Sequence, residues 1–173
     1  ADDTPPGLRQ FASPPNFYDR YLYRTRKFTD ADKRLASHYL SFAEAQPQSV
    51  PEALSSVAKT TMAVRLLNKS LTANPADDES FVLLGRAYMQ LSGVEQMIAG
   101  PNMPTRLVKL RQVQALSAFR QASALNPESL MAWDGIFQIH QQLNHLDLTM
   151  EALSKWLDLA EKQAPMSDPQ FDE

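Results

Sequence analysis

The 173-residue chain contains no cysteine, which excludes disulfide bonds and thiolate metal sites and leaves the redox compartment open. It has only five glycines, and none belongs to a glycine-rich loop of the kind that cradles phosphate. No apolar run approaches the roughly 18 residues expected of a membrane-spanning helix. The sequence therefore predicts no disulfide framework, no nucleotide loop and no membrane span within this chain.

Catalytic motifs are absent as well. The three histidines are His38, His140 and His145, and no His-Glu-x-x-His motif is present. His140 and His145 are five residues apart and do not share a helical face, so we interpret His140 as a packed structural histidine. No Gly-x-Ser-x-Gly motif marks a nucleophile. We predict a protein that is not an enzyme, with no catalytic residue, metal ligand, cofactor or small-molecule substrate.

Charge argues against general nucleic-acid binding, because the net charge is −3. The charge is unevenly spread: residues 20–34 hold six basic and two acidic side chains, whereas residues 144–173 hold seven acidic and two basic ones. Solvated helix faces are the simplest explanation, and steering of a charged partner is the alternative. Arginines interleaved with aromatic residues before residue 28 could also stack on bases, although no β platform is expected there.

Proline, apolar spacing and capping residues together predict an all-α chain. The hydrophobic content of 43% is enough for one compact core, and twelve prolines provide stops between helices. The apolar periodicity predicts helices over about 30–45, 52–72, 78–91, 104–125, 128–143 and 146–163. Between the third and fourth helices, Gly93, Gly100-Pro101 and Pro104 predict a loop of about ten residues.

An internal repeat organises residues 51–163. Asn74-Pro75 recurs 52 residues later as Asn126-Pro127. The same offset relates Ala63 to Ala115, Leu67 to Phe119, Phe81 to Trp133 and Leu84 to Ile136. A second offset of 34 relates Ala115 to Thr149, Phe119 to Leu153 and Ala122 to Trp156. The two offsets differ by 18, which indicates a 34-residue unit that carries one 18-residue insertion.

The repeat unit is marked, in order, by Phe81, Leu84, Gly85, Tyr88, Ala115, Phe119, Ala122 and Pro127. This order of residue types resembles the tetratricopeptide repeat, a 34-residue helix-turn-helix. Gly85 is placed to let the second helix approach closely. The third unit matches less well, with Phe137 at the glycine position and His140 at the tyrosine position. The resemblance implies a right-handed α-α superhelix of about three helix pairs.

The resemblance also implies a binding groove, lined by the first helix of each unit. The matching groove positions are Glu79, Val82, Arg86, Met89, Met131, Asp134, Gln138 and Gln141. Methionines would adapt to the shape of a peptide or helix, and polar groups would fix its register. The lysine and asparagine with which some family members hold a C-terminal carboxylate are absent, since Val82 and Arg86 stand there.

Three segments are expected. Residues 1–28 form a proline- and aromatic-rich segment, partly packed on the helices or serving as a linker; residues 29–163 form the repeat domain; residues 164–173 form a disordered acidic tail. The chain begins without methionine, as a processed protein or an excised piece would. Within the insertion we expect Met97, Ile98 and Met103 to fold back, beside a basic edge made by Arg106, Lys109 and Arg111.

The predicted function is recognition of a protein or peptide partner in the groove. The alternative is a structural role, in which the insertion or the end of the array forms a homodimer or docks within a larger protein. Neither the partner nor the cellular location follows from the sequence.

Overall fold

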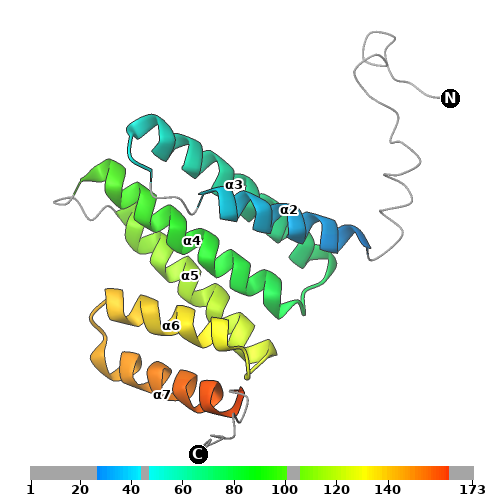
Figure 1. Cartoon of the computed structure of the whole chain (residues 1–173), viewed down its shortest axis with the longest axis vertical. Coiled ribbons are helices and arrows are strands. Elements are labelled where there is room, and N and C mark those ends of the chain that lie inside the picture. The colour runs from blue at the N-terminus through cyan, green and yellow to red at the C-terminus, as the bar shows by residue number, and fades with distance from the viewer. Residues whose placement is uncertain (1–26, 44–46, 101–105, 164–173) are drawn as a thin grey trace, which may run out of the picture.

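Six helices make up the part of the chain that the structure describes. The structure is a computed structural model that describes residues 27–43, 47–100 and 106–163, and these ranges contain no strand (Figure 1). The helices are α2 Lys27–Ala43, α3 Val50–Ala73, α4 Asp78–Ala99, α5 Arg106–Leu125, α6 Leu130–Gln142 and α7 Leu146–Gln163. The all-α prediction is confirmed for these ranges. The predictions for residues 1–26 and 164–173 concern segments outside these ranges.

Helices that follow one another in sequence lie side by side (Figure 1). Each helix packs against the next, and α4 in addition contacts α2 and α6. This order, in which adjacent helices pack together and α4 also meets α2 and α6, is compatible with a helical repeat fold. Among the described residues, no helix is both long and apolar enough to cross a membrane.

The turn before α4 is repeated before α6. Both turns start with Asn-Pro, and in both the asparagine N–H donates to the carbonyl four residues earlier, at 2.9 and 2.8 Å. In both, the N–H three residues later donates back to the asparagine carbonyl, at 3.3 and 3.1 Å. Asp77 and Ser129 then cap α4 and α6, each accepting an N–H bond from three residues further on. The 52-residue offset is therefore a repeat of backbone geometry as well as of residue types.

The start of α3 shows why its boundary was predictable. Ser49 is the N-cap, and its side chain accepts a bond from the N–H of Glu52. The carboxylate of Glu52 accepts in return from the backbone N–H of Gln48, at 2.8 Å. Pro51 lies in the first turn, where its missing N–H costs no helical hydrogen bond.

Two apolar clusters form the core, and each centres on a repeat-equivalent residue. Leu67 of α3 is fully buried in the first cluster, and Phe119 of α5 is 1% exposed in the second. The second cluster joins α4, α5, α6 and α7 through Val82, Ala115, Phe119, Ala122, Ala132, Ile136, Ile139 and Ala152. Burial at both positions of the 52-residue offset agrees with the repeat.

The prediction of a loop beginning at Gly93 was wrong, because α4 continues to Ala99. Gly100 ends the helix with a positive φ of 83°, and α5 begins at Arg106. Beyond the predicted end of the helix, Ser92 and Val94 are buried, and Arg111 Nε donates to Glu95 Oε1 at 3.2 Å. Packing on α5 outweighs the low helix propensity of glycine. The insertion lengthens the α4/α5 pair instead of interrupting it.

Because α4 continues to Ala99, the predictions for the methionines, Ile98 and the basic edge of the insertion also change. Met97 and Ile98 lie on the last turns of α4 and are 46% and 44% exposed, and Met103 is outside the described ranges. Arg111 is paired with Glu95. Of the basic edge, Arg106 and Lys109 are exposed.

Gly93 provides a test of this correction. It lies inside α4, and a Cβ built on it meets no atom within 4 Å. We therefore expect Gly93→Ala to raise the free energy of unfolding by about 0.5–1 kcal/mol, because alanine favours the helix and clashes with nothing. Urea denaturation measures the change. A loop at this position would show no gain.

Candidate functional site

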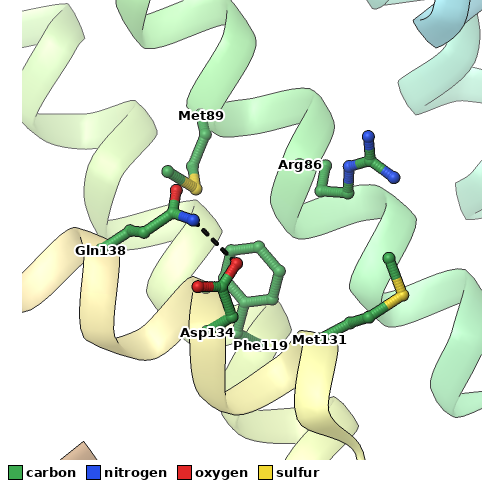
Figure 2. Close-up of a pocket in the computed structure, with 7 residues that line it drawn as sticks. Arg86, Met89, Phe119, Met131, Asp134 and Gln138 are labelled. Atoms are coloured by element: carbon green, nitrogen blue, oxygen red, sulfur yellow. Dashed lines mark hydrogen bonds between the residues drawn. The ribbon is translucent and has the colours of Figure 1, made fainter. Parts of the chain in front are cut away.

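A pocket of about 360 Å³ lies between α4 and α6, above α5 (Figure 2). Its lining residues are Arg86, Met89, Phe119, Met131, Asp134, Gly135 and Gln138. We call it the α4–α6 pocket. Its volume is in the range of pockets that enclose small ligands or side chains of a partner.

The floor of the pocket is the ring of Phe119, held between two glycines. A Cβ on Gly85 of α4 would come within 2.7 Å of this ring, and a Cβ on Gly135 of α6 within 2.4 Å. Both distances are shorter than real Cβ atoms show, so only glycine fits without a shift. The expected close approach at Gly85 is confirmed, and the ring of Phe119 sets the spacing of the two walls.

The walls come from two helices and carry different groups (Figure 2). α4 supplies the exposed Arg86 and the half-buried Met89. α6 supplies Met131, which is 58% exposed, together with Asp134 and Gln138. The amide of Gln138 donates to Asp134 Oδ2 at 2.7 Å, which fixes the carboxylate on the α6 wall.

Five of the eight predicted groove residues therefore meet in one pocket: Arg86, Met89, Met131, Asp134 and Gln138. The other three do not line it. Val82 is only 4% exposed and packs in the core with Phe119, so it has little surface for a partner. Glu79 is exposed at the contact with α2, and Gln141 is exposed on the last turn of α6.

Two lining residues, Phe119 and Gly135, were missed as site residues. Phe119 was identified only as a residue of the repeat pattern, although its ring is also the pocket floor. Gly135 lies inside α6, where glycine costs about 1 kcal/mol relative to alanine. A glycine at an unfavourable position within an apolar helix is the signal that could have indicated close approach of another side chain to that helix.

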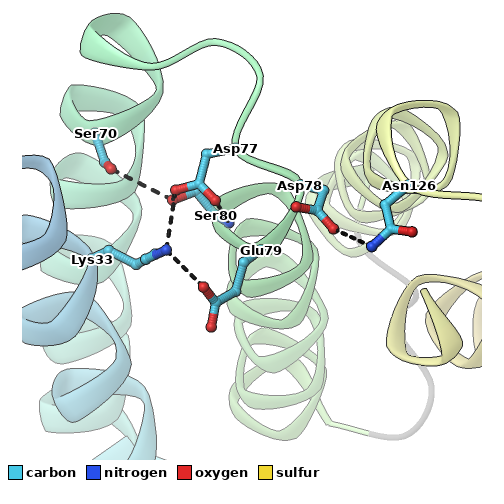
Figure 3. Close-up of polar contacts among 7 residues, drawn as sticks. All are labelled: Lys33, Ser70, Asp77, Asp78, Glu79, Ser80 and Asn126. Atoms are coloured by element: carbon cyan, nitrogen blue, oxygen red, sulfur yellow. Dashed lines mark hydrogen bonds and ion pairs between the residues drawn. The ribbon is translucent and has the colours of Figure 1, made fainter. Parts of the chain in front are cut away.

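Glu79 belongs to a charged cluster that joins α2 to the start of α4 (Figure 3). Lys33 Nζ lies 2.6 Å from Glu79 Oε2 and 3.4 Å from Asp77 Oδ2. Burial opposes the charge of Lys33, but the bond to Glu79 and the nearby carboxylates outweigh it, so the pKa of Lys33 is raised. Burial is likewise outweighed at Asp77 by bonds from Ser80 and by Lys33, so the pKa of Asp77 is lowered.

A smaller pocket of about 180 Å³ lies between α5, α6 and α7. It is lined by Arg120, Ser123, Trp133, Ile136, His140, Leu148, Glu151 and Ala152. His140 is only 3% exposed, and its Nδ1 is buried without a protein hydrogen-bond partner. Burial lowers the pKa of His140, the positive charge of Arg120 and His145 lowers it further, and Glu151 opposes them.

This shift in pKa predicts a loss of stability in mild acid. Folding favours neutral His140, so the unfolded chain, whose histidine has a pKa near 6.5, binds the proton more readily. We expect the free energy of unfolding to fall as the pH drops below about 6.5. His140→Gln should reduce this fall, whereas His145→Gln at an exposed site should change it less. Denaturation of the native protein and both variants at pH 7.5 and 5.0 measures the change in unfolding free energy. An equal fall in all three proteins would contradict the prediction.

In the described ranges, no three histidine, aspartate or glutamate side chains are grouped so that they could hold a metal ion. The α4–α6 pocket instead offers two flexible methionines, one cation and one carboxylate–amide pair. Such a surface can bind by shape and charge.

No protein-family model matches the chain. Curated proteins also show no significant match.

Proposed function

We propose that the chain is a tetratricopeptide-like array of three helix pairs that binds a segment of another protein, without catalysis, in the α4–α6 pocket. The observation that carries this proposal is the meeting of Arg86, Met89, Met131, Asp134 and Gln138 around one hollow. The repeated Asn-Pro turns and the glycine contact on Phe119 support the repeat.

Exposure of the walls favours a macromolecular partner. Met131 is 58% exposed, and Met89 is half-buried on the other wall. Apolar side chains at the rim of a polar hollow gain most when a partner covers them. Their unbranched thioethers adapt to different shapes, which suits a peptide or a helix.

The proposal is tested by capture of partners from a lysate of the source organism. The test variant is Arg86→Glu, Met131→Glu, and the matched control is Arg106→Glu, Met150→Glu, which makes the same changes at exposed sites that do not line the pocket. We expect a partner retained by the native chain and the control to be lost by the test variant. Circular dichroism checks that all three remain folded. A partner kept by the test variant would contradict the proposal.

A structural role is the second candidate, because apolar side chains gather at the connected ends of α4 and α5. Met97, Ile98, Leu107, Leu110 and Val113 are 43–59% exposed there. A second copy of the chain could cover them. Light scattering tests this role: a stable dimer that persists in the pocket variant and dissociates in Ile98→Asp, Leu110→Asp would favour it over recognition in the pocket.

The argument for nucleic-acid binding through basic side chains is weakened at Lys33. The basic segment at residues 20–34 includes Lys33, which is engaged with Asp77 and Glu79 and so is not placed to meet phosphate. Binding through this segment would have to weaken steeply with salt.

A further inference from the structure

In the part of the chain that the structure describes, no element covers the outer face of α7. Among the described helices, α7 packs along α6 alone, and it lies at the opposite end of the array from α2 (Figure 1). Ala152 is the only residue of α7 that is buried. The last unit of a repeat array normally has a polar outer face, which keeps the array soluble. The residues of α7 depart from that rule.

Apolar side chains form a stripe along this face. Three of them, Leu146, Met150 and Leu157, are 76%, 66% and 52% exposed. Their spacing of four and seven residues places them on one side of the helix. Leu153 and Ala160 are partly exposed and continue the same spacing, and we call these five residues the apolar stripe. A contiguous apolar surface of this kind marks a site at which a partner binds.

An acidic stripe runs beside the apolar stripe, one residue later at each step. It consists of four exposed acids: Asp147, Glu151, Asp158 and Glu161. One residue along an α-helix is a rotation of about 100°, so the acidic stripe borders the apolar stripe over the same turns. Ser154 occupies the remaining position of the series, and both lysines of α7 lie outside the two stripes. The face is therefore apolar along its centre and negative along one edge.

Charge distinguishes between the occupants that could cover this face. The ten residues that follow α7 carry three acidic side chains and no basic one, so like charges would oppose their docking. An antiparallel two-fold pair of α7 helices would place acidic stripe against acidic stripe, because both copies present the same edge. A helix that has its own apolar stripe, with lysine or arginine beside it, avoids this repulsion and gains attraction instead.

We propose that the outer face of α7 binds a basic amphipathic helix of another protein. The apolar side chains of that helix cover the apolar stripe, and its lysines or arginines meet the acidic stripe. About four turns of helix match the surface, because residues 146–161 span about 24 Å of helix axis. This second surface does not depend on recognition in the α4–α6 pocket, which has no lining residue on α7.

Fluorescence anisotropy with labelled model peptides tests the proposal. The probe is an amphipathic helix of about 18 residues, with leucines spaced as in the apolar stripe and lysines beside them. One comparison peptide has glutamate in place of each lysine, and another has the residues of the probe in scrambled order. We expect the probe to bind about tenfold more tightly than either comparison peptide, and its affinity should fall as salt is added.

A pair of variants tests the apolar stripe. Met150→Gln, Leu157→Gln should weaken binding of the probe by about tenfold or more, because both side chains would be covered by the bound helix. The matched control is Met62→Gln, Leu54→Gln, which makes the same changes at sites on α3 that are 43% and 58% exposed. The control should bind the probe like the native chain.

A second pair tests the acidic stripe. Asp158→Asn, Glu161→Gln should weaken binding of the probe about threefold to tenfold and reduce its salt dependence, because two opposite charges are lost at an exposed edge. Asp30→Asn, Glu128→Gln makes the same changes at exposed sites away from α7 and should leave the affinity unchanged. Circular dichroism checks that every variant remains folded.

Three results would overturn the proposal. Equal binding of the lysine and glutamate helices would show that charge selects nothing. Unchanged binding in Met150→Gln, Leu157→Gln would place the helix elsewhere. A native dimer in light scattering that dissociates in that variant would make a second copy the occupant. The Arg86→Glu, Met131→Glu variant should bind the probe like the native chain, so failure at α7 and failure of recognition in the pocket are distinguishable.

Discussion

The Phe119→Ala variant is expected to lose about 3–5 kcal/mol of unfolding free energy, the range for removing a buried aromatic ring. Phe119 is 1% exposed and packs in a cluster that joins α4, α5, α6 and α7. Removing the ring leaves a cavity between Gly85 and Gly135, which have no side chains to fill it. Urea denaturation followed by circular dichroism at 222 nm measures the loss.

The matched control is Phe42→Ala, the same chemical change on α2. Phe42 is 60% exposed, so its loss should change the unfolding free energy by no more than about 0.5 kcal/mol. Similar small changes in both variants would mean that Phe119 is not the packing centre. Removing the ring of Phe119 also removes the pocket floor. Partner binding should therefore fall in Phe119→Ala even where the protein remains folded.

The Gly135→Ala variant is expected to be destabilised by about 1–3 kcal/mol, the range for overpacking a core. This is opposite to the usual effect in a helix, where alanine is favoured over glycine by up to about 1 kcal/mol. The reason is the 2.4 Å separation between a Cβ on Gly135 and the Phe119 ring. Gly93→Ala is the matched control with the opposite expected sign, since a Cβ there meets nothing.

A second substitution shows whether the two effects share one contact. In the Phe119→Ala background the ring is gone, so Gly135→Ala should become neutral or stabilising. The double variant should therefore lose less unfolding free energy than the sum of the losses in the two single variants. Purely additive effects in urea denaturation would show that the glycine does not meet the ring.

Much of the helical order could be predicted because local signals agree with tertiary packing. Proline at residues 47 and 51 excludes a helix across that region, and the break between α2 and α3 lies there. α7 begins at Leu146 and ends at Gln163, as the apolar spacing indicated. At these points capping, proline placement and apolar periodicity favour the same boundary, so no tertiary contact was needed to decide it.

Other features depend on tertiary contacts that cannot be predicted from the amino-acid sequence. Gly93 is a poor helix former, yet α4 runs through it because Val94 and Glu95 gain packing and an ion pair on α5. Val82 was expected in the groove from its repeat position, but the apolar side chain is buried beside Phe119. The pocket itself requires the distance between α4 and α6, which Gly135 permits. These outcomes are set by the competition between local propensity and packing.

The packing of neighbour on neighbour also bears on how the chain acquires its fold. Among the described helices, every pair in contact is adjacent in sequence or separated by a single helix. Most of these contacts join helices that are adjacent in sequence, so little chain entropy is lost before a contact forms, and rapid folding is expected. During synthesis each helix could dock on the one that left the ribosome before it, without waiting for the C-terminus.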